Sequence, residues 1–258
     1  MSARTLPDRI ADELIARVFT GELAPGDKLP PDRALATELG VDRTSLRNAL
    51  RQLTRMNLLR PVRGSGVTVL DYRQHAGLDF LAAVLEIPGL ELGGAFLLEA
   101  LDHWEQAMPS IVSSALARIT PAQLGEIDEL LEHQAEVLEA GADLDEVARL
   151  EVGLIDSVVA MLGDVTLRLM ANSTRPLRRR LTRLQLELTD DPLAQIQASR
   201  MLLRRALEDG PSPDIIRTAH AQILSVVHAP LRAHLRTLPT RPHRTSRWQR
   251  HESASART

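Results

Sequence analysis

The chain has 258 residues, of which 44% are hydrophobic but only 2% aromatic, and its formal net charge is −3 at pH 7. Because leucine and alanine favour helices and strands draw on β-branched and aromatic residues, this composition predicts a mostly helical protein. The lack of cysteine excludes disulfides, cysteine-ligated zinc and thiol catalysis, and it suits the reducing cytoplasm, where we expect the protein to act. No apolar run approaches the roughly 20 residues of a membrane span, and the N-terminus lacks a signal-peptide pattern, so we expect no membrane partner.

The charge is divided unevenly along the chain. Residues 1–73 carry 12 Arg/Lys and 9 Asp/Glu, residues 74–236 carry 14 and 24, and residues 237–258 carry 5 and 1, so the net charges are +3, −10 and +4. A basic head on an acidic body is typical of a DNA-binding module joined to a domain that does not bind DNA. We therefore expect one domain at 1–73, a second at 74–236, and a disordered basic tail at 237–258.

The head begins with two predicted helices. Residues 6–20 show apolar residues at fourfold spacing, which predicts the first helix. Pro31 is suited to the first position of the second helix, and Gly40 to the positive φ angle at its end. Asp42 follows as the expected N-cap of a third helix, its carboxylate accepting a backbone amide.

The third helix, from Arg43 to about Met56, is predicted to have one apolar and one basic face. Its arginines at 43, 47, 51 and 55 fall every fourth residue and form a slowly drifting stripe, and Asp42 is the only acid near them in the sequence. Such a stripe can be an ordinary solvated face. Here the interleaved glutamates that usually offset it are missing, and DNA phosphates or base edges would supply the partners.

A hairpin is predicted after this helix. Leu58–Val62 and Val67–Leu70 read as short strands joined by the sequence Arg63-Gly64-Ser65-Gly66. The two glycines permit a tight turn, and the thin tip with its single arginine suits a DNA minor groove, although a simple loop is the alternative interpretation.

These motifs resemble the GntR family of bacterial winged-helix transcription regulators. The matching phrases are Pro-x-x-Arg-x-Leu-Ala from residue 30, Gly-Val-x-Arg-Thr-Ser-x-Arg-x-Ala-Leu from residue 40, and the glycine-rich wing, while DYRQHAGLDFL resembles the linker of the FadR subfamily. The resemblance implies a homodimer on double-stranded, pseudo-palindromic operator DNA. Asp42 and Asn48 depart from the family, which commonly has Ser or Thr and Glu there. The family's DNA contacts fall on Arg33, Arg43, Thr44, Ser45, Arg47, Arg63 and Gly64.

The rest of the chain is predicted to be helical. Apolar residues at i, i+3 and i+4 mark segments separated by glycine or proline, which predicts an all-α bundle of six or seven helices. The overall fold class is therefore mostly α, with a winged helix-turn-helix followed by a helical bundle. In the FadR subfamily such a bundle binds an effector and dimerises. The predicted segments are 78–86, 94–117, 121–139, 144–161, 164–185, 192–208 and 213–236.

The resemblance also raises the question of a metal site in the bundle. Many relatives use an Asp, a His four residues later and two further histidines, which suits zinc or nickel. Here these positions fall on Glu151, on Ile155, near Ser199 or Arg200, and on His220. One imidazole and one carboxylate make a poor site, so we expect no metal and no cofactor, with a metal-dependent carboxylate sensor as the alternative.

An arginine cluster suggests where an effector would bind. Arginines at 175, 178, 179, 180 and 183 lie on one predicted helix of an acidic domain. Most would form a solvated face, but one or two could reach a carboxylate or phosphate. Arg175, Arg179 and His220 are the candidates. Without the metal residues the chain resembles the acyl-CoA-responsive branch, so a fatty acyl-CoA or a related organic acid is the leading expectation.

An enzyme with a helical catalytic domain and an accessory DNA-binding head is the competing function. It would need convergent catalytic groups, and the sequence shows no GxSxG, HExxH, P-loop or Rossmann motif. We therefore expect no catalytic residues and no enzyme activity. The sequence leaves open which DNA is bound and whether the effector releases or promotes that binding.

Overall fold

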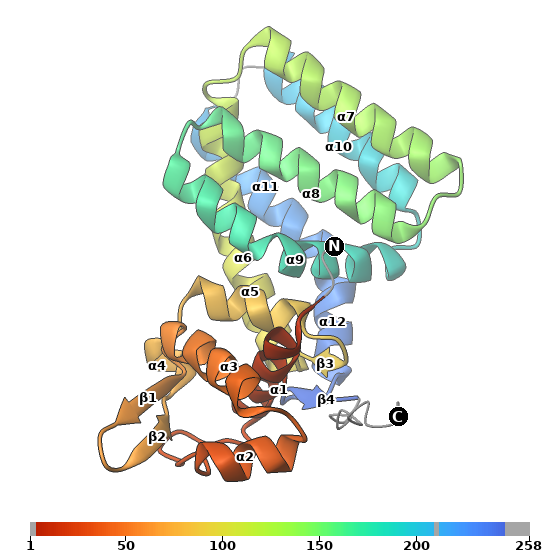
Figure 1. Ribbon diagram of the computed structural model, residues 1–258. Coiled ribbons are helices and arrows are strands. Elements are labelled where there is room, and N and C mark those ends of the chain that lie inside the picture. Colours follow the sequence, from red (N-terminus) through yellow and green to blue (C-terminus); the bar gives the residue numbers. More distant parts are fainter. Residues whose placement is uncertain (1–3, 209–211, 246–258) are drawn as a thin grey trace, which may run out of the picture. The chain divides into compact units, whose positions relative to one another are not determined.

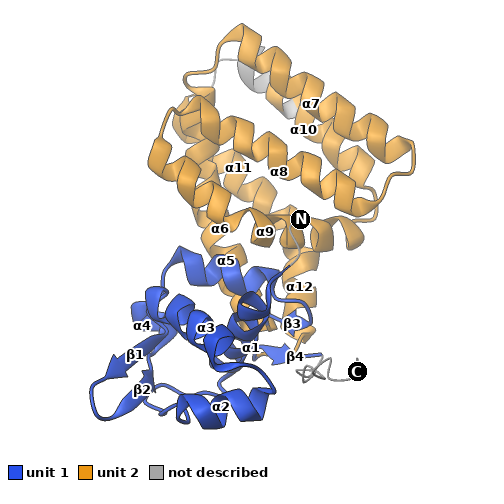
Figure 2. Ribbon diagram, viewed as in Figure 1, with its two compact units in different colours: residues 1–92, 241–258 blue, residues 93–240 orange. Residues whose placement is uncertain are grey.

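The computed structural model describes residues 4–208 and 212–245, and it divides the chain into two compact units (Figures 1 and 2). Unit 1 comprises residues 1–92 and 241–258, and unit 2 comprises residues 93–240. The chain therefore passes between the units twice. No helix in the described parts of the chain is both long and apolar enough to span a lipid bilayer.

Unit 1 contains the predicted winged helix-turn-helix. Its helices are α1 (Leu6–Thr20), α2 (Asp32–Leu39) and α3 (Arg43–Arg55), and its wing is the antiparallel pair β1 (Leu59–Val62) and β2 (Gly66–Val69). The core between the helices is made of fully buried leucines and isoleucines. One boundary differs from the prediction, because Pro31 has ψ 144 and precedes α2 instead of forming its first turn.

The structure places the segment before residue 246 differently from the disordered tail expected at 237–258. The strand β4 (His243–Arg244) pairs antiparallel with β3 (Leu90–Glu91) in unit 1. Arg244 Nη2 lies 2.6 Å from a carboxylate oxygen of Glu13, a side chain only 2% exposed on α1. A buried carboxylate needs such a partner, which explains why this segment is ordered. Residues 246–258 lie outside the described residues.

The expected bundle begins later than predicted. Two short helices, α4 (Tyr72–His75) and α5 (Leu78–Glu86), belong to unit 1. Aromatic packing accounts for this assignment, because the Phe80 ring of α5 lies 6.1 Å from Phe19 of α1 and 5.1 Å from Tyr72 of α4, centroid to centroid.

Unit 2 is all-α in the part of it that the structure describes, as predicted. Its helices match the predicted segments closely, except that residues 213–236 form two helices that meet at His228. Pro230 explains the break, because it has no backbone N–H to continue the first helix. The helices are α6 (Gly94–Leu116), α7 (Pro121–Glu139), α8 (Leu144–Met161), α9 (Val165–Glu187), α10 (Pro192–Glu208), α11 (Pro213–Val227) and α12 (Ala229–Thr237).

The packing of unit 2 determines where its cavity lies. α8 packs against α9 and α7, α10 packs against α7, and α11 packs against α6 (Figure 1). Since α10 and α11 have different main partners, the space between them is not closed by direct helix packing.

Candidate functional site

The start of α3 is held by the cap that the sequence predicts. Asp42 Oδ1 accepts a 2.8 Å hydrogen bond from the Ser45 backbone N–H, and the Ser45 hydrogen bonds keep the pKa of Asp42 below its ordinary value. The carboxylate also compensates the positive end of the helix dipole. The first turn of α3, with Arg43 and Thr44 exposed and Ser45 half-buried, is thereby fixed in orientation.

The basic face of α3 is exposed, but one of its arginines has an acid partner that the sequence spacing does not reveal. Arg47 Nε donates a 2.8 Å hydrogen bond to Asp32 Oδ2 at the start of α2, and Arg47 remains 57% exposed. Further along the helix, Arg51 donates to Asn48 Oδ1 at 3.3 Å. Arg43, by contrast, has no ion-pair partner among the described residues. Exposed surface pairs are weak, so Arg47 can exchange Asp32 for another anion at little cost.

The wing presents the remaining predicted residues. Gly64 has φ 75 and Gly66 has φ 91, a backbone region that glycine adopts without strain, so Arg63 stands at a narrow exposed tip. Lys28 Nζ donates to Ser65 Oγ at 2.8 Å and adds a second positive charge beside it. Arg33 lies exposed in the first turn of α2. All seven predicted DNA-contact residues are thus at or near the surface of unit 1.

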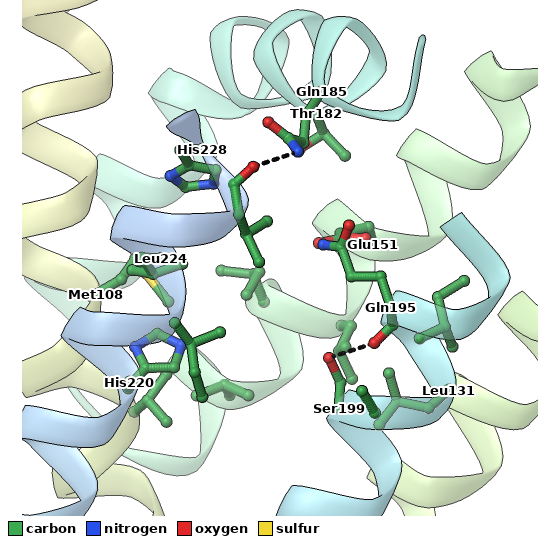
Figure 3. A pocket seen from close by; sticks show the side chains of 18 of the residues that line it. Met108, Leu131, Glu151, Thr182, Gln185, Gln195, Ser199, His220, Leu224 and His228 are labelled. Carbon is green, nitrogen blue, oxygen red and sulfur yellow. Dashed lines mark hydrogen bonds between the residues drawn. The ribbon is translucent and has the colours of Figure 1, made fainter. Parts of the chain in front are cut away.

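Unit 2 contains a large, partly open cavity lined by residues of α6 to α12, with a volume of about 910 Å³ (Figure 3). This volume lies in the usual range of small-molecule pockets. The lining is mainly leucine, isoleucine and valine from α6 to α12. Part of the α11 wall is accessible to solvent, since Ile215 is 60% and Val226 is 74% exposed. Such exposed apolar surface is typical of a binding site.

A polar group lies in the middle of these apolar walls. Glu151 of α8 accepts a 3.0 Å hydrogen bond from Gln134 Nε2 of α7, and burial raises the pKa of the Glu151 carboxyl. Across the cavity in Figure 3, α11 contributes His220, and His228 follows that helix. Burial lowers the pKa of both histidines. Of the two, only His228 has a carboxylate partner, since its Nδ1 lies 3.1 Å from Glu105 Oε1.

The structure corrects the choice of arginines for this site. Arg175 and Arg179 do not line the cavity: Arg175 donates to Asp156 Oδ2 at 2.8 Å and Arg179 faces Asp145, both from the exposed side of α9. Arg178 lines it instead and is only 5% exposed. Sequence reasoning passed over Arg178 because consecutive residues point about 100° apart on a helix, and only the packing shows which of them faces inward.

The positions that resemble the family's metal ligands do come together. Glu151, Ile155, Ser199 and His220 all line the cavity, although they come from three helices. No group of three His, Cys, Asp or Glu side chains suited to a metal ion occurs within the described residues. An isoleucine and a serine replace two imidazoles, and two remaining donors fit a divalent metal poorly.

Comparison with known proteins supports the interpretation of unit 1. A family model described as "Bacterial regulatory proteins, gntR family" matches residues 6–69. The HTH-type transcriptional regulator Mce2R of Mycobacterium tuberculosis is 33% identical over 175 residues, which cover 68% of this chain and 71% of that protein. A fatty acid metabolism regulator protein of Pasteurella multocida is 28% identical over 144 residues, 55% of this chain and 53% of its own.

A solved structure shares the fold. The structure described as "Lar controls the expression of the Listeria monocytogenes agr system and mediates virulence" aligns with a TM-score of 0.54 and 14% sequence identity. The alignment covers 91% of this chain and 99% of the other. At this identity the similarity extends to the arrangement of elements only.

Proposed function

This chain is a transcriptional regulator of the bacterial GntR family, and we propose that it binds operator DNA as a homodimer through unit 1 while a small molecule in unit 2 controls that binding. Its relatives are named as regulators rather than enzymes. The observation that carries the proposal is the capped start of α3, whose first two turns present Arg43 and Arg47 to solvent.

This geometry suits a DNA major groove. The N-terminal residues of a recognition helix contact base edges, and those further along contact phosphates. Arg43, Thr44, Ser45 and Arg47 occupy the first turns of α3, so we assign them to bases or nearby phosphates. Arg33, Arg63 and Gly64 lie on the flanking elements and would contact the backbone or the minor groove.

The regulatory step is a coupling between the two units. An effector that binds one arrangement of unit 2 more tightly shifts the population toward that arrangement. Two recognition helices must be about 34 Å apart to enter successive major grooves, so a small change in the dimer would alter operator affinity. The cavity of unit 2 is the effector site in this proposal.

An acyl compound is the effector class that we favour. The cavity walls are apolar, and one relative is named a fatty acid metabolism regulator. A fatty acyl-CoA is the representative suggested by the FadR resemblance. A metal-dependent carboxylate sensor is less well supported, because Ile155 and Ser199 stand in place of two imidazole ligands.

The DNA assignment is tested by fluorescence anisotropy on a duplex from the region upstream of the gene. Arg43→Ala and Arg47→Ala should each weaken specific binding by roughly 1–3 kcal/mol. Arg55→Ala, on the same helix but far from its start, is the matched control and should weaken specific and non-specific binding equally. Unchanged affinity of both test variants would refute the assignment.

The effector assignment is tested by thermal-shift measurements on the full chain. Acyl compounds, simple carboxylates and the metals zinc and nickel are compared, and each compound that shifts the melting temperature is then added to the protein–DNA complex. We expect a shift and a change in DNA affinity with an acyl compound. A shift with zinc or nickel alone would favour the metal-dependent alternative.

A further inference from the structure

The charged side chains around the cavity indicate what kind of head group it can hold. The acids in the lining are Glu151, Asp190 and Asp191, while Arg178 is the single guanidinium within the described part of the lining. A phosphate or carboxylate head group would therefore meet mainly acids. Burying an anion without a partner is costly, so the charges of the lining side chains decide whether an anionic ligand can bind in the cavity.

The charge of Arg178 is already matched. Its Nη2 donates to Asp156 Oδ1 at 2.6 Å and to the Ala171 carbonyl at 2.9 Å, and its guanidinium carbon lies 5.5 Å from the centre of the Trp104 ring. Its other two nitrogens, Nε and Nη1, are buried and have no hydrogen-bond partner among the described residues. Arg175, which also contacts Asp156, is 51% exposed and solvated. The charge of Arg178 is thus balanced by Asp156, while only one of its three guanidinium nitrogens is hydrogen-bonded to the protein.

The acids of the lining occupy both the centre and the edge of the cavity. Asp190 and Asp191 are exposed where α9 connects to α10, and Asp191 Oδ1 also accepts the Ala194 backbone N–H at 2.9 Å. Glu151 lies at the centre, bonded to Gln134. An anion that passes the edge would be repelled there and again at the centre. The three phosphates of coenzyme A would be repelled most strongly.

The walls favour a long apolar body. On α11, Ile215, Ile223 and Val226 are exposed and line the cavity. Covering them with a hydrocarbon chain would remove their apolar surface from water, and each buried methylene of the ligand would raise its affinity roughly fourfold.

We propose that the effector is an uncharged, elongated lipid, such as a fatty ester or alcohol, whose single hydrogen-bonding group meets Glu151 and Gln134 and whose chain lies between α10 and α11. This inference rests on the effector role proposed above and narrows the acyl class to compounds without an ionised head group. The Gln134 amide would donate a hydrogen bond to an ester carbonyl, and the Glu151 carboxylate would accept one from an alcohol hydroxyl.

The test compares three ten-carbon probes on the full chain by isothermal titration calorimetry at pH 7.5, each below its micelle concentration. Methyl decanoate should bind at least 10-fold more tightly than decanoate or decanoyl-CoA. If decanoate or decanoyl-CoA binds as tightly as the ester, the inference is overturned. If only decanoyl-CoA binds, the proposal of an acyl effector is supported and the proposal of an uncharged head group is refuted. If none of the three binds, the acyl effector and the uncharged head group are both refuted, while the DNA assignment is decided by its own test.

A variant that adds a positive charge to the lining tests whether the lack of an available cation causes the preference for the ester over decanoate. Thr182 lines the cavity on α9, so Thr182→Lys places a cation there and should raise decanoate affinity about 10-fold while methyl decanoate changes by less than about threefold. Thr166→Lys makes the same substitution at an exposed position of the same helix outside the cavity and should change neither affinity.

Two further variants keep the inference falsifiable if Thr182→Lys does not fold. Glu151→Gln preserves the shape of the side chain and removes the acid, so decanoate should bind more tightly and methyl decanoate should be retained. Arg178→Met tests the rival assignment, in which this guanidinium anchors a carboxylate. A selective 10- to 100-fold loss of decanoate binding, with the ester unaffected, would establish the rival and refute our inference.

Discussion

The two units use charge in opposite ways. The α3 face of unit 1 carries exposed arginines, of which Arg43 has no acid partner among the described residues and Arg47 pairs with the half-buried Asp32. Unit 2 places Arg178 in a buried wall and matches it with Asp156. A surface that binds a polyanion needs available cations, whereas a cavity that binds an apolar molecule needs its charges neutralised. The comparison shows that the number of arginines in a segment does not by itself reveal an anion site.

The largest expected effect is a difference in the stability lost when a leucine is replaced by alanine in the core of unit 1 and in the cavity wall of unit 2. Leu46 of α3 is 0% exposed and surrounded by other buried side chains, so Leu46→Ala should destabilise unit 1 by about 3 kcal/mol. Leu131→Ala in unit 2 should cost about 2 kcal/mol, because one side of that side chain faces the cavity while the other packs against Ile127 and Ile196. Amide hydrogen exchange, followed in peptides from each unit, measures the loss of stability in both variants. Equal costs would mean that the cavity wall is as tightly packed as the head.

A smaller loss should follow removal of the C-terminal ion pair in unit 1. Arg244→Ala leaves Glu13 buried with Arg17 as its remaining partner, at 2.8 Å, and should destabilise unit 1 by about 2 kcal/mol. Arg241→Ala, an exposed neighbour, is the control and should have no measurable effect. Faster amide exchange in residues 6–20 of the Arg244 variant alone would support the pair. The same exchange rate in both variants would contradict it.

Filling the cavity with a larger side chain should abolish ligand binding without lowering the stability of unit 2. Val158 of α8 lines the cavity, so Val158→Phe should leave unit 2 unchanged or stabilise it by about 1 kcal/mol while abolishing binding of methyl decanoate. DNA affinity without ligand should stay the same. Val165→Phe, at a position of α9 that is 70% exposed, is the matched control. Retained ligand binding in the Val158 variant would place the ligand elsewhere.

The smallest effect should be a pH dependence in unit 2. Arg200 and Arg204 of α10 hydrogen-bond to Asp128 of α7 and lower its pKa to about 2. Because the folded value lies below the ordinary 3.8, this carboxylate stabilises unit 2 above pH 4, and the contribution is lost as the pH falls from about 4 to 2. We expect about 1 kcal/mol, since the pair is partly exposed. Asp128→Asn should remove this dependence in acid denaturation followed by circular dichroism, and an unchanged profile would exclude the pair as its source.

Local features were predictable because they depend on near neighbours in the chain. The cap of Asp42 on Ser45 spans three residues, and the wing turn is set by two glycines. The family resemblance and the seven DNA-contact candidates rest on the same contiguous stretch. Their placement on the surface of unit 1 agrees with the prediction, while contact with DNA stays a proposal.

Features that join distant segments were not predictable from spacing. Asp156 reaches Arg178 across 22 residues, and β4 pairs with β3 across about 150. The expected effector residues Arg175 and Arg179 were misplaced for this reason, because neighbouring positions on one helix are indistinguishable until its packed face is known. His220 lines the cavity, and its contact with an effector stays a prediction.

The sequence by itself therefore determined most of the helices, the Asp42 cap and the basic stripe of the head, since these follow from hydrogen bonds and side-chain spacing within a few residues. Only the tertiary structure decided which arginine faces the cavity, that two acids lie at its edge, and that the C-terminal strand completes unit 1. These depend on which helix faces meet, and that choice is made by the packing of the whole chain.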